Sequence, residues 1–288
     1  MLIRIGYDLQ FQISAPVAML AMLHVHPSRA HDLLESDRVQ IDPAVPVEQY
    51  IDGFGNLCSR FLAPQGMLRL HNSTLIRDSG EPDAVNWDAR QVPVHELPHE
   101  TLQFLMNSRY CEVDRLSPLA AGLFGGIEPG WPRVQAICDY VHKKVAFGYH
   151  FARSTKTALE VHDECNGVCR DFQHLAITLC RCVNIPARYA TGYLGDIRVP
   201  AVPAPMDFSA WFEVYLDGRW WTFDARHNTP RVGRVLMAVG RDASDVAITT
   251  SFGLAPLSAF NVISDELPEV GSEASAKMDL LQSYPLAV

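Results

Sequence analysis

The most informative part of the sequence is Asn166-Gly167-Val168-Cys169-Arg170-Asp171-Phe172-Gln173-His174-Leu175-Ala176, because it sets a cysteine between a glycine turn and the start of a helix. Leu175, Leu179 and Val183 recur at helical spacing after the glycine, which predicts a helix with Cys169 in its first turn. That turn leaves backbone N–H groups without partners, and the helix dipole favours a negative charge there. We therefore expect a lowered pKa for the Cys169 thiol, and a nucleophilic role for this residue.

The composition indicates a globular protein with real hydrophobic cores. The chain has 288 residues, of which 48% are hydrophobic and 20% charged, enough for two ordinary domains. The formal net charge of −9 argues against nucleic acid and anionic membranes as partners, because both bind clustered Lys and Arg side chains. The longest apolar stretch, Pro16 to Leu23, is shorter than the roughly 20 residues needed to span a bilayer.

The cysteines and the first residues indicate a cytoplasmic location. Seven cysteines, an odd number, lack the regular spacing of a secreted disulfide scaffold. The start of the chain also lacks the long apolar core of a signal peptide. We expect no metal and no cofactor, because the His and Cys spacings fit no zinc site and no carboxylate run has a calcium-loop pattern.

Residues 1–80 are expected to form a β-sandwich-like N-terminal domain. Apolar side chains alternate at Ile3, Ile5, Tyr7, Leu9 and Phe11, and prolines and glycines separate further short apolar runs. Residues 81–98 are polar and proline-rich, which is typical of a linker. Residues 271–288 begin with a polar Gly-Ser-Glu-Ala-Ser segment and are expected to form a mobile tail.

Residues 99–270 read as helices followed by an antiparallel sheet. Helical spacing recurs at 102–106, 116–124 and 134–145, ahead of the Cys169 helix. Residues 187–194 read as a strand, and 211–216 with 220–223 as a hairpin around Asp217-Gly218. Helices packed on an antiparallel sheet define the α+β class, which is our predicted fold class.

The hairpin places chemical groups at its open end. If its loop has an even number of residues, Trp211 faces Asp224 and Ser209 faces Arg226. Ser209 and Asp224 then lie diagonally on one face of the sheet. In a regular strand His227 would lie on the face opposite to Asp224.

Four blocks of sequence together resemble the transglutaminase-like superfamily of papain-type cysteine enzymes. They are Gly167-Val168-Cys169-Arg170-Asp171-Phe172, Ile185-Pro186-Ala187-Arg188-Tyr189-Ala190-Thr191-Gly192-Tyr193, Ala210-Trp211-Phe212-Glu213-Val214-Tyr215-Leu216 and Trp220-Trp221-Thr222-Phe223-Asp224. The resemblance covers roughly residues 130–230, and the first 80 residues resemble the β-rich N-terminal region of bacterial members. It implies a papain-like core in which Cys169 attacks an amide carbonyl to form a thioester and Asp224 is the orienting carboxylate.

One residue departs from the family pattern. The family carries histidine immediately before the Ala-Trp of the hairpin, and here that position holds Ser209. A hydroxyl cannot act as the general base at neutral pH. One interpretation is that another histidine serves as the base: His227, His174 or His150.

Two further interpretations stay open. In one, Arg170 or Arg226 and the helix terminus keep Cys169 ionised, and a Cys169-Ser209-Asp224 set runs slow or specialised acyl transfer. In the other, the protein is a catalytically silent module that binds a peptide or regulates a partner.

The favoured function is that of a cysteine peptidase or amidase acting on a peptide or protein amide. Trp211 and Arg226 are candidate substrate-binding residues, as is Asp171, which also suits a helix cap. The backbone N–H of Cys169 is a candidate oxyanion donor. Cross-linking is less favoured, because nothing marks an amine acceptor site. The substrate and the oligomeric state stay open.

Overall fold

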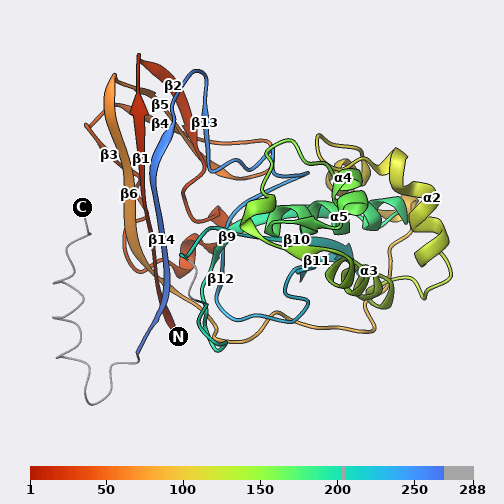
Figure 1. Cartoon of the computed structure of the whole chain (residues 1–288). Helices are drawn as coiled ribbons and strands as arrows, with labels where there is room; N and C mark the ends of the chain where they lie inside the picture. The colour runs from red at the N-terminus through yellow and green to blue at the C-terminus, as the bar shows by residue number, and fades with distance from the viewer. Residues whose placement is uncertain (203–204, 269–288) are drawn as a thin grey trace.

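A computed structural model describes residues 1–202 and 205–268 of the chain. The tail expected at 271–288 lies outside the described residues. The fold has two parts that lie side by side, a β-sandwich and a sheet covered by helices (Figure 1). The predicted α+β class is confirmed.

The sandwich consists of two four-stranded antiparallel sheets. The first has the order β14 (Leu257–Leu267), β1 (Leu2–Ile13), β6 (Gly66–Arg77) and β3 (Gln40–Asp42). The second has the order β13 (Thr249–Ser251), β2 (Val17–Ala21), β5 (Leu57–Ala63) and β4 (Val47–Ile51). The alternating apolar side chains of β1 are buried between the sheets, as their period of two requires.

The last described strands complete the N-terminal sandwich. β14 pairs with β1 from Leu2↔Leu267 to Phe11↔Leu257, and β13 pairs with β2. Both strands fall within residues 99–270, the range that was predicted to hold helices followed by an antiparallel sheet of their own. An alternating pattern predicts a strand but does not predict its partner, so this long-range pairing has no local signature.

The second part is built on an antiparallel sheet with the order β11, β10, β9 and β12. These strands span Arg219–Phe223, Ser209–Leu216, Ala187–Leu194 and Arg234–Gly240. The hairpin register runs from Leu216↔Arg219 to Phe212↔Phe223, which is the register predicted for an even loop. Its two turn residues, Asp217 and Gly218, have φ values of 50° and 83°, in the left-handed region that such a tight hairpin requires.

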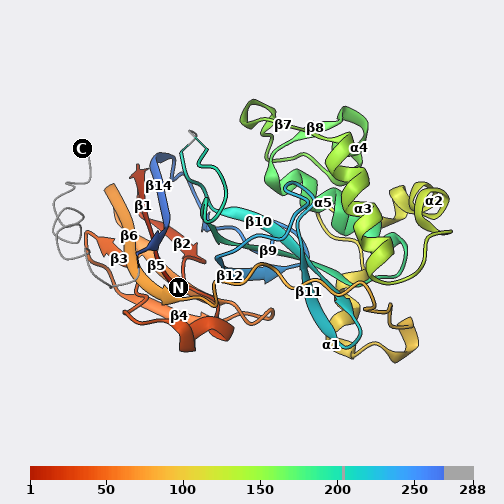
Figure 2. The same cartoon turned by 90° about the horizontal axis from the view of Figure 1, so that it is seen from below.

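Helices cover one face of this sheet (Figure 2). They are α2 (Val113–Phe124), α3 (Trp131–Lys144), α4 (Ala158–Glu164) and α5 (Cys169–Cys182). The short α1 (His99–Leu102) lies near the tip of β11, on the side of the sheet away from α5 (Figure 2). The 3₁₀ turns of the chain span Pro27–Asp32, Val94–Glu96, Gln103–Leu105 and Tyr149–Phe151. A short parallel ladder joins β7 (Ala146–Phe147) to β8 (Asn166–Gly167) just before α5. α5 packs against α2, α3, α4 and β10, and its residues from Asp171 to Arg181 are buried, as expected for a central helix.

The segment between the two parts is tied down along its length. The Asp83 carboxylate accepts from Arg234, the Ala89 carbonyl accepts from Trp131 N–H, and the Arg90 carbonyl accepts from Asp217 N–H. The connecting segment is therefore held in place by β12, by α3 and by the turn between β10 and β11.

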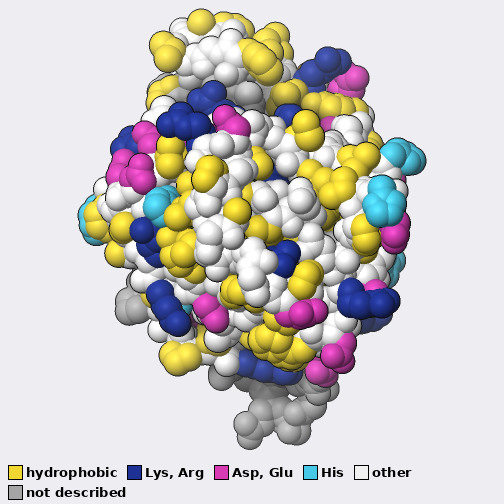
Figure 3. Space-filling view, turned by 90° about the vertical axis from the view of Figure 1, so that its right-hand side faces the viewer, with side chains coloured by type: hydrophobic (Ala, Val, Ile, Leu, Met, Phe, Trp, Pro, Cys, Tyr) yellow, Lys and Arg dark blue, Asp and Glu magenta, His cyan; other side chains and the backbone are white. Residues whose placement is uncertain are grey.

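Among residues 1–202 and 205–268, no helix combines the length and apolar character needed to cross a membrane. On the helical face, basic side chains are scattered among acidic and apolar ones (Figure 3). That face therefore presents no continuous basic patch.

Candidate functional site

The turn before α5 sets Cys169 at the first position of the helix. Asp171 Oδ2 accepts a hydrogen bond from Val168 N–H at 2.9 Å, and Asp171 Oδ1 pairs with Arg170 at 3.0 Å. A Cβ at Gly167 would lie 2.6 Å from the Asp171 Cβ, so only glycine fits beside this cap. Asp171 is fully buried, so its carboxylate holds the helix start and does not reach the cleft.

Cys169 is half-buried and lies between two cavities of about 340 and 480 Å³. Both cavities are lined by Cys169, Asp207, Phe208 and Ser209. The second has mostly apolar walls, which include Tyr189, Val246, Ala247, Ile248 and Phe260. The thiol therefore stands at the junction of the two cavities.

Burial raises the pKa of the Cys169 thiol to about 11. The Arg226 guanidinium acts to lower this pKa, while the Asp207 carboxylate raises it further. The expectation of a lowered pKa was wrong, because desolvation shifts a pKa by up to several units whereas a helix terminus contributes only about 0.3–1 kcal/mol. At neutral pH Cys169 is thus a neutral thiol.

Asp224 follows the last residue of β11 and is buried. Its Oδ1 accepts from Gln173 Nε2 at 3.0 Å, and its Oδ2 accepts from His227 Nδ1 at 2.8 Å and Arg234 Nη2 at 3.0 Å. Burial acts to raise the pKa of Asp224, but the His227 hydrogen bond and the Arg234 charge outweigh it and lower the pKa well below its usual value. Asp224 is therefore an ionised carboxylate that holds an imidazole.

His227 reaches Asp224 because the strand has already ended. β11 stops at Phe223, and the next residues form a turn in which Asn228 N–H donates to the Asp224 carbonyl at 2.8 Å. His227 N–H also donates to Asp224 Oδ1 at 3.1 Å, as in an Asx turn. The expectation that His227 lies on the opposite face assumed a regular strand, and the turn removes that condition.

The first cavity brings the candidate residues together. Cys169, Ser209, Arg226 and His227 all line it, and Asp224 lies behind His227. The Arg226 guanidinium lies 3.8 Å from the centre of the Phe147 ring, which holds it at the cavity wall. Four of the seven predicted site residues thus share one cavity, and Asp224 is hydrogen-bonded to one of these four.

Ser209 begins β10 and pairs with Gly192 of β9. It is half-buried and lines both cavities at Cys169. The Asp224 oxygens are engaged by Gln173, His227 and Arg234. The position that the family gives to histidine therefore contributes a hydroxyl to the cleft wall.

The other two candidate histidines lie elsewhere. His174 is buried, stacks on Tyr110 at 4.9 Å and accepts from Ala243 N–H at 3.1 Å. Burial lowers the pKa of His174 to about 3. His150 is exposed and packs on the Phe151 ring at 3.9 Å. His227 is thus the one of the three that lines a cavity with Cys169.

Trp211 was expected to line a substrate groove. The side chain is only 2% exposed and packs with Ala190 and Val239, with the Arg234 guanidinium 5.1 Å from its ring. It borders the space around Arg234, while the cavities at Cys169 are lined by other residues. Its place is structural because an indole at this strand position points to the sheet face away from α5.

The residues that hold Asp224 in place were not predicted from the sequence. Gln173 is buried on α5, donates to Asp224 and the Ala210 carbonyl, and accepts from Ala225 N–H. It comes four residues after Cys169, on the same side of the helix, and this spacing is the signal that could have found it. Arg234, held between Asp224 and Asp83, has no comparable local signal.

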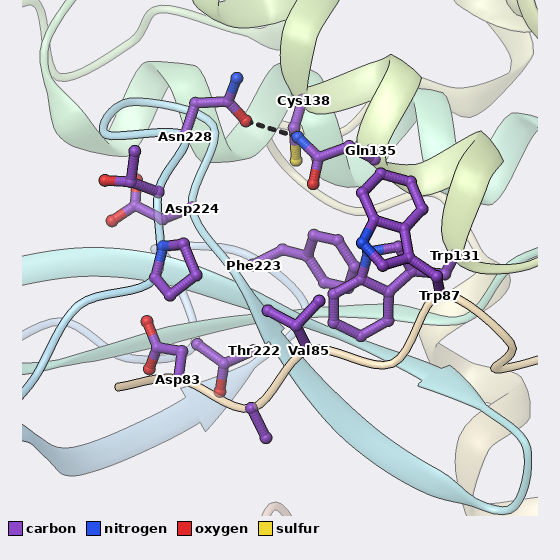
Figure 4. Close-up of a pocket in the computed structure, with 13 residues that line it drawn as sticks. Asp83, Val85, Trp87, Trp131, Gln135, Cys138, Thr222, Phe223, Asp224 and Asn228 are labelled. Atoms are coloured by element: carbon purple, nitrogen blue, oxygen red, sulfur yellow. Dashed lines mark hydrogen bonds between the residues drawn. The ribbon is translucent and has the colours of Figure 1, made fainter. Parts of the chain in front are cut away.

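Asp224 also borders a third cavity, of about 250 Å³, on the side of α3 and the connecting segment (Figure 4). Trp87 and Trp131 form aromatic walls of this cavity, and Gln135 Nε2 donates to Asn228 Oδ1 at 2.9 Å. This bond ties the turn that carries His227 to α3.

In the described residues, no group of three or more His, Cys, Asp or Glu side chains is placed to hold a metal ion.

Comparisons with known proteins agree with this geometry. Residues 117–225 match the family model described as the transglutaminase-like superfamily. A solved structure of a candidate cysteine protease from Cytophaga hutchinsonii is 30% identical, with a TM-score of 0.81 over 94% of this chain and 92% of that one. An uncharacterised protein, ML0607 of Mycobacterium leprae, is 28% identical over 73% of this chain and 77% of its own length. This chain belongs to the transglutaminase-like superfamily.

Proposed function

We propose that this protein hydrolyses an amide bond of a peptide or protein, with Cys169 as nucleophile, His227 as general base and Asp224 as the carboxylate that orients His227. One observation carries the proposal. The His227 imidazole is hydrogen-bonded through Nδ1 to Asp224 at 2.8 Å, while His227 and Cys169 line the same cavity. A carboxylate bonded to Nδ1 leaves Nε2 free to accept a proton.

The reaction follows the chemistry of a neutral thiol. As the Cys169 sulfur forms a bond to the amide carbonyl carbon, its proton passes to His227 Nε2. The first turn of α5 offers the Cys169 backbone N–H to the developing oxyanion. His227 then gives the proton to the leaving nitrogen as the C–N bond breaks, and water hydrolyses the thioester. Asp224 stays ionised and stabilises the imidazolium.

The raised pKa of Cys169 supports this division of roles. A thiol that is neutral at rest gains most from a base that acts only when the carbonyl is in place. The alternative in which Cys169, Ser209 and Asp224 act without histidine requires a resting thiolate. Burial of Cys169 works against that requirement.

A catalytically silent binding module is the second candidate. It is favoured by the same raised pKa together with the hydroxyl at Ser209. In this account the two cavities hold a peptide without cleaving it. The two candidates differ in whether Cys169 becomes acylated.

The deciding experiment is to incubate the protein with a mixed peptide library and to follow cleavage and the intact mass of the protein. The proposal predicts new peptide termini and an acyl adduct on Cys169, both lost in Cys169→Ala. His227→Ala should reduce the rate about 10²- to 10⁴-fold, the usual contribution of a general base. Cleavage that persists in Cys169→Ala would contradict the proposal. Peptides that bind but stay intact in wild type would support the binding module.

A further inference from the structure

A single carboxylate lies at the junction of the two cavities beside Cys169. Asp207 precedes β10 and, like Cys169, lines both cavities. A substrate whose carbonyl carbon reaches the Cys169 sulfur must therefore pass Asp207. This position puts one negative charge close to the scissile amide.

The other charged groups of the cleft are already engaged. Arg226 is held on the Phe147 ring, and Arg170 is paired with Asp171. Asp196 accepts from Val202 N–H at 2.7 Å and lies 4.0 Å from Arg231. In the described part of the chain, by contrast, no Lys, Arg or His side chain forms an ion pair with Asp207.

The surroundings of Asp207 disfavour the ionised form of its carboxyl group. It is half-buried, and burial raises the pKa of its carboxyl, while the Phe208 N–H and the Arg226 charge offset only part of this effect. A partly buried carboxylate without an ion-pair partner costs free energy that a bound cation would recover.

We propose that Asp207 is the specificity residue for an ammonium group on the substrate, placed within about one residue of the scissile amide. This inference rests on the proposed function, because it names the substrate class of the same site. The ammonium group has two sources in peptides, a free α-amine and a lysine side chain. Either one would form a charge-assisted hydrogen bond with Asp207.

The same contact would activate the nucleophile. The Asp207 charge acts to raise the pKa of Cys169, and Tyr149 and Tyr189 respond to it in the same direction. An ammonium group that neutralises Asp207 removes this effect when the substrate arrives. Correct binding and thiol activation are thereby coupled through one carboxylate.

The test measures binding to full-length Cys169→Ala by calorimetry, which needs no turnover. One pair of probes is tetra-alanine amide with a free and an acetylated amine. The other is an acetylated peptide that carries either lysine or norleucine. At least one charged probe should bind about tenfold more tightly than its uncharged partner. Equal affinities within both pairs would overturn the proposal.

Variants in the Cys169→Ala background locate the effect. Asp207→Asn should abolish the preference and Asp207→Glu should keep part of it. Asp196→Asn, a matched carboxylate on the wall of the same cavity, should leave the preference intact. A preference that survives in Asp207→Asn would overturn the assignment to this residue.

Two further readouts separate this proposal from the proposed function. With Cys169 present, Asp207→Asn should lower the pH midpoint of Cys169 alkylation by iodoacetamide by about 0.5 pH unit or more, because a like charge is removed. An unchanged midpoint would contradict the coupling of binding to activation. Peptides that bind with the charge preference but are never cleaved would refute amide hydrolysis and leave the Asp207 subsite standing.

Discussion

His227 Nδ1 and Asp224 Oδ2 lie 2.8 Å apart, and the two residues are separated by only three positions in the chain. The base that we propose and the carboxylate that would orient it thus come from a single turn after β11. The family pattern would instead take the histidine from β10, where this chain has Ser209. The His227 imidazole lines the same cavity as Cys169. In the proposed mechanism this turn therefore supplies the imidazole that position 209 lacks.

The protonation state of Cys169 gives a direct prediction. Because burial raises its pKa to about 11, the rate of alkylation by iodoacetamide should still increase above pH 9. Arg226→Gln should shift the profile to still higher pH, since the guanidinium favours the thiolate. The measurement is the alkylation rate of Cys169 by mass spectrometry between pH 6 and 11. A plateau reached below pH 8 would show a resting thiolate and contradict this account.

Ser209 is expected to matter little for proton transfer. Its hydroxyl lines the cleft, and the Asp224 oxygens are occupied by other groups. Ser209→Ala should therefore reduce the acylation rate less than about tenfold, well below the range for loss of a general base. The check is a comparison of Ser209→Ala with His227→Ala under the same conditions. A larger loss in Ser209→Ala would restore the Cys169-Ser209-Asp224 interpretation.

Gln173 is expected to be both a stability and a positioning residue. Gln173→Leu removes its hydrogen bonds to Asp224, the Ala210 carbonyl and Ala225 N–H, and leaves these groups buried without partners. We expect a loss of about 2–3 kcal/mol in the free energy of unfolding, measured with urea. Thr178→Val, on the same helix, removes a single hydrogen bond to the His174 carbonyl and serves as a control with a smaller loss. Equal losses in the two variants would argue against a special role for Gln173.

The β10–β11 hairpin and the start of α5 show which structural features local sequence can predict. The register from Leu216↔Arg219 to Phe212↔Phe223, the bounds of the strand at 187–194 and the start of a helix at Cys169 were all predictable, because turn chemistry and periodicity are local. The order of these elements also predicted the α+β class, and the resemblance added the papain-like core and the likeness to cysteine enzymes.

The electrostatics of the site were not predictable in the same way. The pKa of Cys169 depends on how completely the surrounding elements exclude water, and the place of His227 depends on where β11 ends. Arg234 reaches Asp224 from a strand ten residues further along the chain. Each of these features is set by tertiary packing, which periodicity does not report.

Buried His174 should make stability depend on pH. Its pKa is about 3 in the folded protein and about 6.5 in an unfolded chain, so the unfolded state binds more protons between these values. The free energy of unfolding should therefore fall as pH decreases from 6.5, by at most about 1.4 kcal/mol per pH unit from this group.

The control is His174→Gln, whose side-chain oxygen can accept from Ala243 N–H as the imidazole does. It should be less stable than wild type at pH 7, because the stacking on Tyr110 is lost, but its stability should depend less on pH. Urea unfolding at pH 7, 6 and 5 measures both. Parallel pH profiles for the two proteins would refute this assignment.

The proton transfer from Cys169 to His227 can be measured as the burst of nitrophenolate when the protein is mixed with p-nitrophenyl acetate, an acyl donor that needs no knowledge of the substrate. We expect a burst in wild type, no burst in Cys169→Ala, and a burst rate about 10²- to 10⁴-fold lower in His227→Ala. A burst of wild-type rate in folded His227→Ala would contradict this role of His227.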